Sequence, residues 1–216
     1  MTVDFQATLF DALDDGRSDS ALLGSLGPSV RRTPLSAGAW VDVRPGWVTG
    51  ADDLFLRLLR EVPWYAERRR MYDRVVDVPR LLKFYGAGEV LPDPVLAEAR
   101  DRLSVHYVEE LGEPFTTAGL CYYRDGRDSV AWHGDTIGRS RTEDTMVAIV
   151  SFGEARRLQL RPRPGADGGT ISFTLGHGDL VVMGGSCQRT WEHAVPKTTH
   201  PVGPRISVQF RPRGVR

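Results

Sequence analysis

The second half of the chain, after Gly112, alternates short apolar segments with turn signals. Six segments rich in β-branched and aromatic residues follow one another, with the sequences TTAGLCYY, TMVAIVSF, RLQLRP, TISFTL, DLVVM and RISVQFR. Between them lie stretches such as RDGRD, PGADGG and LGHGD, whose Gly, Asp and Pro residues favour turns. Many short strands at this spacing are typical of an antiparallel sandwich or barrel. We therefore expect a protein built around a double-sheet jelly roll.

Two helices are expected to flank this β structure. In ADDLFLRLLREV the leucine and phenylalanine residues recur at helical spacing, and Asp52 is the expected N-cap. In LPDPVLAEARDRLSVHYVEEL, Pro94 suits the first turn of a helix. The apolar stripe of that helix is formed by Val95, Leu96, Ala99, Leu103 and Tyr107. The fold class that the sequence predicts is therefore mostly β with flanking helices.

Composition divides the chain into three segments. Residues 1–35 are acidic at first and then rich in Gly, Ser and Pro, which favours a flexible N-terminal tail. Residues 36–112 contain the two helices and the segment WYAERRRMYDRVVDVPRLLKFYG, which is basic and aromatic together. Residues 113–216 contain the predicted strands. We expect residues 36–216 to fold as one compact domain, and we expect a monomer.

Charge and cysteine content limit the possible classes of function. The chain has 28 basic and 28 acidic side chains, so its overall charge predicts neither nucleic-acid nor membrane binding. No apolar run approaches the roughly 20 residues that a membrane-spanning helix needs. The first residues are acidic, unlike those of a secretory signal. With only two cysteines, Cys121 and Cys187, a disulfide framework is not expected. These features favour a cytoplasmic protein without membrane association.

The N-terminal tail carries the short sequence QATLF, from Gln6 to Phe10. It resembles the peptide with which bacterial DNA-processing proteins dock on the sliding clamp: a glutamine, two variable residues, a leucine and a phenylalanine. In this interpretation Gln6 forms hydrogen bonds, while Leu9 and Phe10 are two adjacent apolar anchors. The alternative is an apolar stretch that folds back on the domain. A sliding clamp is therefore one candidate partner.

His133 and Asp135, in the segment AWHGDTIG, are separated by a single glycine. In an extended chain, side chains two residues apart point to the same side, so these two could coordinate one metal ion. The alternative is a solvated turn. His193 is the best candidate for a third ligand, because it follows the apolar segment DLVVM; the other histidines are expected on a helix face or in loops, at positions His106, His177 and His200. Two histidines and one carboxylate on one face form the facial triad of non-haem Fe(II) oxygenases.

The last predicted strand, RISVQFR, has two different faces. One face is apolar, with Ile206, Val208 and Phe210, while the other carries Arg205, Ser207, Gln209 and Arg211. Two guanidinium groups with polar residues between them make a poor core face and a good site for a dicarboxylate such as 2-oxoglutarate. The alternative is an edge strand whose polar face is solvated.

These residues together resemble the AlkB family of Fe(II)/2-oxoglutarate-dependent dioxygenases. The resemblance rests on the ordered set His133, Asp135, His193, Arg205 and Arg211. Five segments are similar in sequence to the DNA-repair branch of this family: VPRLLKFYG, YRDGRDSVAWHGD, VSFGEARRLQLR, HGDLVVMGGSCQRTWEHAVPK and PRISVQFR. The resemblance therefore covers about residues 60–213. It implies a double-stranded β-helix with Fe(II), 2-oxoglutarate and O2 as cofactors.

The resemblance also implies roles for individual residues. His133, Asp135 and His193 would be the catalytic ligands of Fe(II). Arg205 would pair with the distal carboxylate of 2-oxoglutarate, and Arg211 would touch its other carboxylate or orient Asp135. The cosubstrate would further contact Tyr123 and Ser207. Two positions depart from the family, because Cys121 and Ser207 stand where an asparagine is common.

For the substrate, the resemblance implies an alkylated base in DNA, with RNA as a further candidate. The base must be single-stranded or flipped out of the duplex. The basic and aromatic segment would form a nucleotide-recognition lid, and Tyr85 and Arg161 would be substrate contacts. Trp132 would line the substrate pocket. The alternative is that it packs in the core. The enzyme would demethylate or dealkylate the base oxidatively, releasing formaldehyde and succinate.

One departure concerns the lesion that such an enzyme would prefer. Related repair enzymes often have an acidic residue just after the HxD aspartate, whereas this chain has Thr136 and Ile137. Cationic lesions would lose that partner unless Asp128 or Glu143 compensates, and neutral or etheno adducts become candidates. Two other functions stay open, a 2-oxoglutarate-dependent hydroxylase of a protein or small molecule and a non-catalytic nucleic-acid-binding jelly roll.

Overall fold

The structure is a computed structural model that describes residues 21–71, 74–136 and 141–215. Its helices are α1 (Asp52–Glu61), α2 (Pro94–His106), α3 (Val108–Leu111) and α4 (Cys187–Thr190), and single 3-10 turns span Gly27–Ser29 and Ser36–Gly38. Its strands are β1 (Leu22–Leu23), β2 (Arg31–Pro34), β3 (Ala39–Arg44), β4 (Val48–Thr49), β5 (Tyr65–Met71), β6 (Arg74–Tyr85), β7 (Phe115–Tyr123), β8 (Val130–His133), β9 (Val147–Gly153), β10 (Arg156–Pro162), β11 (Ile171–Leu175), β12 (Asp179–Gly185), β13 (Trp191–Val195) and β14 (Arg205–Pro212). The QATLF motif lies outside the described residues.

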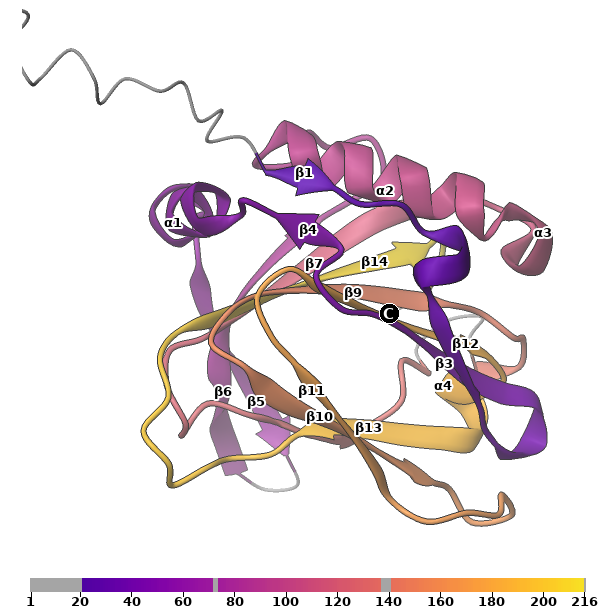
Figure 1. The fold of residues 1–216 in the computed structure, drawn as a ribbon. Coiled ribbons are helices and arrows are strands. Elements are labelled where there is room, and N and C mark those ends of the chain that lie inside the picture. The colour runs from indigo at the N-terminus through magenta and orange to yellow at the C-terminus, as the bar shows by residue number, and fades with distance from the viewer. Residues whose placement is uncertain (1–20, 72–73, 137–140, 216) are drawn as a thin grey trace, which may run out of the picture.

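The molecule has three layers, formed by helices, a large sheet and a small sheet (Figure 1). The large sheet has eight strands in the order β2-β3-β12-β9-β14-β7-β6-β5, and the small sheet has four in the order β11-β10-β13-β8. The strand pairs in both sheets are antiparallel. This arrangement confirms the prediction of a mostly β jelly roll with flanking helices.

Each interface between layers has its own apolar core. Alternate residues of β14 enter different cores, because successive side chains on a strand point to opposite faces. Ile206, Val208 and Phe210 pack under the helices, together with Leu54 of α1 and Leu103 of α2. The opposite face of the large sheet packs against the small sheet through a second cluster, which includes Ile149, Leu158, Leu160, Val181 and Trp191. The polar face of β14 lies between the two sheets.

The two predicted helices form, with one difference at a cap. Asp93 precedes α2, and its side chain accepts a hydrogen bond from the Val95 amide at 2.9 Å, while Pro94 occupies the first turn. The predicted apolar stripe of α2 faces the core. In α1, however, Ala51 is the N-cap and makes no side-chain capping bond, so the prediction that Asp52 caps the helix is wrong. Asp52 lies inside the first turn instead.

The prediction of a flexible tail over residues 1–35 is wrong for its last fifteen residues. Strand β2 pairs with β3 at the edge of the large sheet, and Arg32 forms two hydrogen bonds with the buried carboxylate of Asp42. The Arg32 guanidinium also lies 3.7 Å from the centroid of the Trp40 ring. The Gly, Ser and Pro content suggested a tail, but backbone pairing with β3 and this ion pair order the exposed strand β2.

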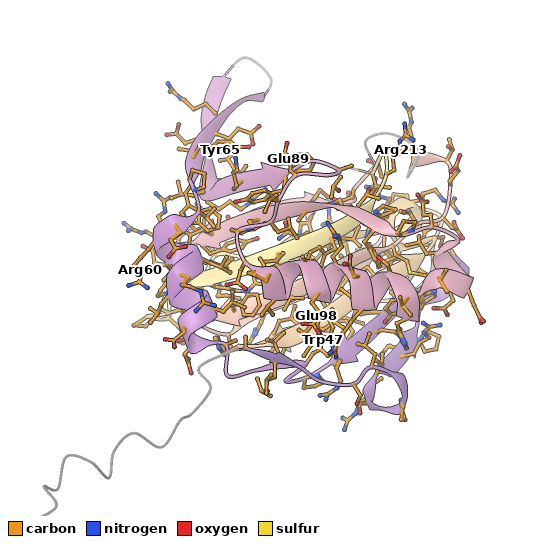
Figure 2. The ribbon with its side chains drawn as sticks, turned by 90° about the horizontal axis from the view of Figure 1, so that it is seen from above. Trp47, Arg60, Tyr65, Glu89, Glu98 and Arg213 are labelled. Carbon is orange, nitrogen blue, oxygen red and sulfur yellow. The ribbon has the colours of Figure 1, made fainter. Side chains whose placement is uncertain are left out.

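Strands β5 and β6 form a hairpin from the basic and aromatic segment. β6 pairs with β7, so the hairpin extends the large sheet rather than forming a separate unit. Figure 2 shows the hairpin projecting beyond the rest of the sheet, with Tyr65 near its base. Residues 36–112 and 113–216 therefore share one sheet. None of the helices in the described residues is long and apolar enough to span a membrane.

Candidate metal and cosubstrate site

His133, Asp135 and His193 meet between the two sheets. His133 ends β8 and lies directly opposite His193 of β13, so that their ring centroids are 4.2 Å apart. Asp135 follows two residues after His133, and its Oδ1 lies 3.7 Å from His133 Nε2. One ligand atom from each of the three residues lies within 4.8 Å of the others. The group matches the facial arrangement of a non-haem iron site.

The hydrogen bonds of His133 select the ring nitrogen that is available to a metal. Its Nδ1 lies 2.8 Å from the carbonyl oxygen of Ala131 and 3.1 Å from that of His193. Because a carbonyl oxygen only accepts, Nδ1 carries the proton and Nε2 keeps its lone pair. Nε2 is also the nitrogen that faces Asp135. Burial lowers the pKa of His193 to about 3, so its imidazole is neutral and able to bind a metal.

Asp135 is buried, yet it is held as a carboxylate. Burial by itself opposes ionisation, but the influences that lower the pKa of the carboxyl outweigh it, and the charge of Arg211 is the largest of them. Arg211 donates from Nε to Asp135 Oδ2 at 2.7 Å. The backbone N–H of Asp135 donates to Oε1 of Gln188 at 2.9 Å. Both the carboxylate and the backbone of this residue are thus fixed by named partners.

Gly134 is required by the close approach of helix α4. A Cβ atom at this position would lie 2.4 Å from the carbonyl oxygen of Gln188 and 3.3 Å from that of Trp191. Neither backbone atom can move away cheaply, since α4 leads directly into β13, which carries His193. The glycine lets the loop with Asp135 pack against α4.

A cavity of about 70 Å³ opens beside His133 and His193. It is lined by residues of both sheets, among them Arg80, Cys121, Tyr123, Ser207, Gln209 and Arg211. Arg205 also lines it and is 2% exposed. Its Nε donates to Ser151 Oγ at 2.9 Å, but its Nη1 is buried without a hydrogen-bond partner among the described residues. A buried cation with an unused donor fits a carboxylate ligand.

The remaining predicted cosubstrate residues lie around Arg205. Its guanidinium lies 5.1 Å from the centroid of the Tyr123 ring, and burial raises the pKa of the Tyr123 phenol, which stays protonated and able to donate. Ser207 accepts a hydrogen bond from Nε2 of Gln209. Cys121 faces Gln209 across 3.6 Å between Sγ and Oε1. The four polar side chains of β14 do share the cavity face, as the alternation predicted.

Two residues that hold this site gave no recognisable signal in the sequence. Ser151 sits in the apolar strand β9 and Gln188 in a one-turn helix. Their roles depend on contacts between segments far apart in the chain, so a motif centred on the ligands misses them. Arg80 was also missed, although it lies within the segment that resembles the family.

The structure brings Trp132 and Arg161 together, but outside the cavity. The Arg161 guanidinium lies 4.5 Å from the centroid of the Trp132 ring and donates two hydrogen bonds to Glu192. Glu192 precedes His193 on β13, so its side chain points to the opposite face of the small sheet. Trp132 therefore neither walls the cavity nor packs in the core, and the charge of Arg161 is matched by Glu192.

Tyr85 is placed away from the site. It is 8% exposed and belongs to the core cluster under the helices, on the face of the large sheet opposite the cavity. Its neighbour Phe84 lies opposite Gly119, and Leu82 lies opposite Cys121, which lines the cavity. Paired residues of antiparallel strands share a face. Phe84, which is 37% exposed, is therefore the aromatic residue at the end of β6 that shares the cavity side.

Asp128, His106 and His177 do not join the site. Asp128 is buried and accepts hydrogen bonds from the backbone and guanidinium of Arg124, so it cannot replace an acid beside the substrate. His106 ends α2, and His177 lies in the turn before β12, where its Nδ1 accepts from the Gly153 amide. Among the described residues, only His133, Asp135 and His193 form a group of metal-binding side chains of this kind.

Comparison with known proteins identifies the family. The 2OG-Fe(II) oxygenase superfamily matches residues 92–211. The human alpha-ketoglutarate-dependent dioxygenase alkB homolog 3 is 31% identical over 88% of this chain and 71% of its own length. The bovine counterpart is 33% identical over 79% of the chain, which spans 66% of that protein. The human DNA oxidative demethylase ALKBH2 is 25% identical over 74% of the chain and 68% of its own length.

Solved structures share the fold at lower identity. OsALKBH1 aligns with a TM-score of 0.56 and 14% identity over 84% of this chain and 99% of its own. A prolyl-4-hydroxylase from Pseudomonas putida aligns with a TM-score of 0.52 and 16% identity over 81% and 93%. These likenesses support the double-stranded β-helix alone. Taken with the matches in sequence and the His, Asp and Arg geometry, they lead to one conclusion: the chain belongs to the AlkB family of Fe(II)/2-oxoglutarate-dependent dioxygenases.

Proposed function

We propose that this protein oxidatively dealkylates N-alkylated bases in DNA, with RNA as a further substrate. The observation that carries the proposal is the pairing of a two-histidine, one-carboxylate group with a buried arginine whose Nη1 has no partner among the described residues. The first suits Fe(II) and the second suits the carboxylate of 2-oxoglutarate. The relatives named as alkB homolog 3 and as DNA oxidative demethylase support the choice of substrate class.

In this proposal His133, Asp135 and His193 hold the iron on one face. When bound, Fe(II), 2-oxoglutarate and O2 supply the oxidant that hydroxylates an alkyl carbon attached to a base nitrogen. His133 offers Nε2 because its Nδ1 proton is engaged by two carbonyl oxygens. Arg211 keeps the carboxylate of Asp135 ionised and oriented, so this residue serves the metal rather than the cosubstrate.

Arg205 binds the distal carboxylate of 2-oxoglutarate in this proposal. Ser151 fixes the guanidinium through Nε, which leaves Nη1 to donate to the ligand. Tyr123 supplies a phenol beside the same guanidinium, and Ser207 supplies a hydroxyl on the neighbouring position of the cavity face. Cys121 takes the place of an amide donor and contributes only a weak donor, so Arg205 carries most of the binding.

The substrate base enters from the side of the β5–β6 hairpin. A target atom on a base edge is reached only when the base is flipped or single-stranded, and aromatic and cationic side chains stabilise such a base and its phosphates. Phe84 lies on the cavity side of β6, and the exposed Tyr65 lies near the base of the hairpin (Figure 2). We therefore replace Tyr85 by Phe84 as the aromatic substrate contact. Arg161 and Trp132 remain candidates only for contacts outside the cavity.

The preference for a type of lesion depends on whether a free carboxylate lies near the base. Asp135 is committed to Arg211 and Asp128 to Arg124, and Thr136 stands where an acid would help to hold a cationic base. We infer that neutral and etheno adducts are accepted at least as well as 1-methyladenine or 3-methylcytosine.

Mass spectrometry of short oligonucleotides tests the proposal. Single- and double-stranded oligonucleotides carrying 1-methyladenine, 3-methylcytosine or an etheno base are incubated with Fe(II), 2-oxoglutarate and ascorbate. We expect the lesion mass to disappear with the intact enzyme and to persist with Asp135→Ala. Persistence of every lesion, with succinate still forming, would mean that the enzyme is a hydroxylase of a protein or small molecule. Absence of succinate as well would favour a non-catalytic nucleic-acid-binding protein.

A further inference from the structure

Gln188 is a buried amide that forms a hydrogen bond with the loop that carries Asp135. It lies in α4, between β12 and β13, and is 1% exposed. Its Oε1 accepts the backbone N–H of Asp135 at 2.9 Å. Its Nε2 is buried and has no hydrogen-bond partner among the described residues.

Burying the Gln188 amide with an Nε2 unpaired in the described part of the chain lowers the stability of the folded protein. A buried amide nitrogen without a partner costs about 1–3 kcal/mol, which offsets what one hydrogen bond contributes. An apolar side chain of similar volume would fill the same space without burying an unpaired donor. The side chain is therefore better explained by what its Oε1 does at Asp135 than by a contribution to the stability of α4.

Helix α4 leads into the strand that carries His193 and packs against the loop that carries Asp135. Its C-terminal end leads within a few residues to His193, and its backbone carbonyl at Gln188 approaches Gly134 so closely that no Cβ fits there. Since β8 and β13 are already paired at His133 and His193, what the bond between Gln188 and Asp135 fixes is the position of the loop with Asp135 relative to α4. Arg211 fixes the carboxylate of Asp135, but it does not hold the backbone.

We propose that Gln188 is a positioning residue, which sets the backbone of Asp135 so that its carboxylate and the two histidines converge on one metal ion. The proposal rests on the metal site described under the proposed function. Residues that orient metal ligands typically change metal affinity by about 10- to 100-fold when they are replaced. Loss of the Gln188 acceptor is expected to act within that range.

Anaerobic titration of the full chain with Co(II), followed by visible absorption, measures metal affinity without turnover. Gln188→Leu removes the acceptor, and it is expected to weaken Co(II) binding by about 10-fold or more. Its melting temperature without metal is expected to stay close to that of the wild type, since the unpaired donor is also removed. Gln188→Glu keeps an acceptor in the same place, and it is expected to retain most of the affinity.

Ser186→Ala is the matched control. Ser186 is equally buried at the start of α4, but its hydroxyl bonds to Ala37 and Thr190 and not to the loop with Asp135. The proposal is overturned if Gln188→Leu binds Co(II) like the wild type, or if Ser186→Ala loses as much affinity as Gln188→Leu. If Gln188→Leu does not fold, Gln188→Asn, whose amide is too short to reach Asp135, takes its place with the same expected loss.

His193→Ala separates this proposal from the one on which it rests. If His193→Ala leaves Co(II) affinity unchanged, the metal group itself is wrong and the proposed function fails with it. If His193→Ala abolishes binding while Gln188→Leu does not affect it, only the positioning role fails. Neither result depends on the identity of the alkylated substrate.

Discussion

Arg211 donates a hydrogen bond to Asp135 across 2.7 Å, and both side chains are largely shielded from solvent. Arg211 belongs to β14 of the large sheet, whereas Asp135 lies in the loop that follows β8 of the small sheet, so this ion pair connects the metal group to the strand that also carries Arg205. Metal and cosubstrate residues are thereby held in one rigid frame.

Arg211→Met should destabilise the metal-free protein. It leaves the buried carboxylate of Asp135 without its partner, and removing one member of a buried ion pair costs about 3–5 kcal/mol. Urea denaturation in the presence of a chelator measures the free energy of unfolding. Arg211→Lys keeps the charge and should lose less than Arg211→Met. A loss below about 1 kcal/mol for Arg211→Met would contradict the role of this pair.

Arg205→Met should weaken 2-oxoglutarate binding and leave metal binding intact. The variant removes the buried donor of a charge-assisted hydrogen bond, which is worth about 2–5 kcal/mol, or at least about 30-fold in Kd. Calorimetric titration of the Co(II)-loaded protein with 2-oxoglutarate checks this. Arg157→Met is the control, because Arg157 is an exposed arginine on the outer side of the small sheet. An equal loss in both variants would rule out a specific site at Arg205.

The two cysteines should react differently with iodoacetamide. Burial raises the pKa of the Cys187 thiol to about 12, so this residue stays protonated and inert at pH 8. Cys121 is partly exposed and lines the cavity beside Arg205. Peptide mapping should therefore find Cys121 alkylated first, and 2-oxoglutarate with Co(II) should slow its alkylation. Alkylation of Cys121 at the same rate with and without ligand would argue against cosubstrate in this cavity.

Phe84→Ala should weaken substrate binding, whereas Tyr85→Ala should lower stability. Tyr85 is packed under the helices, so its truncation should cost about 3–5 kcal/mol of stability. Phe84 is partly exposed on the cavity side, so its truncation should instead raise KM for an alkylated oligonucleotide with little change in melting temperature. Substrate binding that depends on Tyr85 and not on Phe84, in folded protein, would refute this assignment.

The local patterns in the sequence were enough to predict the jelly roll, the two helices and the polar face of β14. Each depends on a local pattern: strand and turn spacing for the jelly roll, helical spacing for the helices, and alternation of Arg205, Ser207, Gln209 and Arg211 for the polar face. The ordering of β2 was missed, because its exposed side chains carry no apolar signal and its stability comes from pairing with β3 and from Asp42.

The site could be predicted only where a residue sits in a recognisable motif. His133, Asp135 and His193 follow a pattern, whereas Gln188 and Ser151 act through contacts that only the folded chain creates. The expectations for Tyr85 and Trp132 were wrong because each side chain lies on the face of its sheet that points away from the cavity. Trp132 is adjacent in sequence to His133, and Tyr85 to Phe84, so the alternation of side chains along a strand sends each of them to the face away from the cavity.

The central claim is best tested by quantifying the products formed from a single N-methylated oligonucleotide. Formaldehyde, succinate and repaired base are quantified together for the wild type and for Asp135→Ala, with Fe(II), 2-oxoglutarate and O2 supplied. We predict that the wild type forms the three products in equal amounts and that Asp135→Ala forms none. Succinate that accumulates without formaldehyde or repaired base on any alkylated oligonucleotide would contradict the assignment of a base dealkylase.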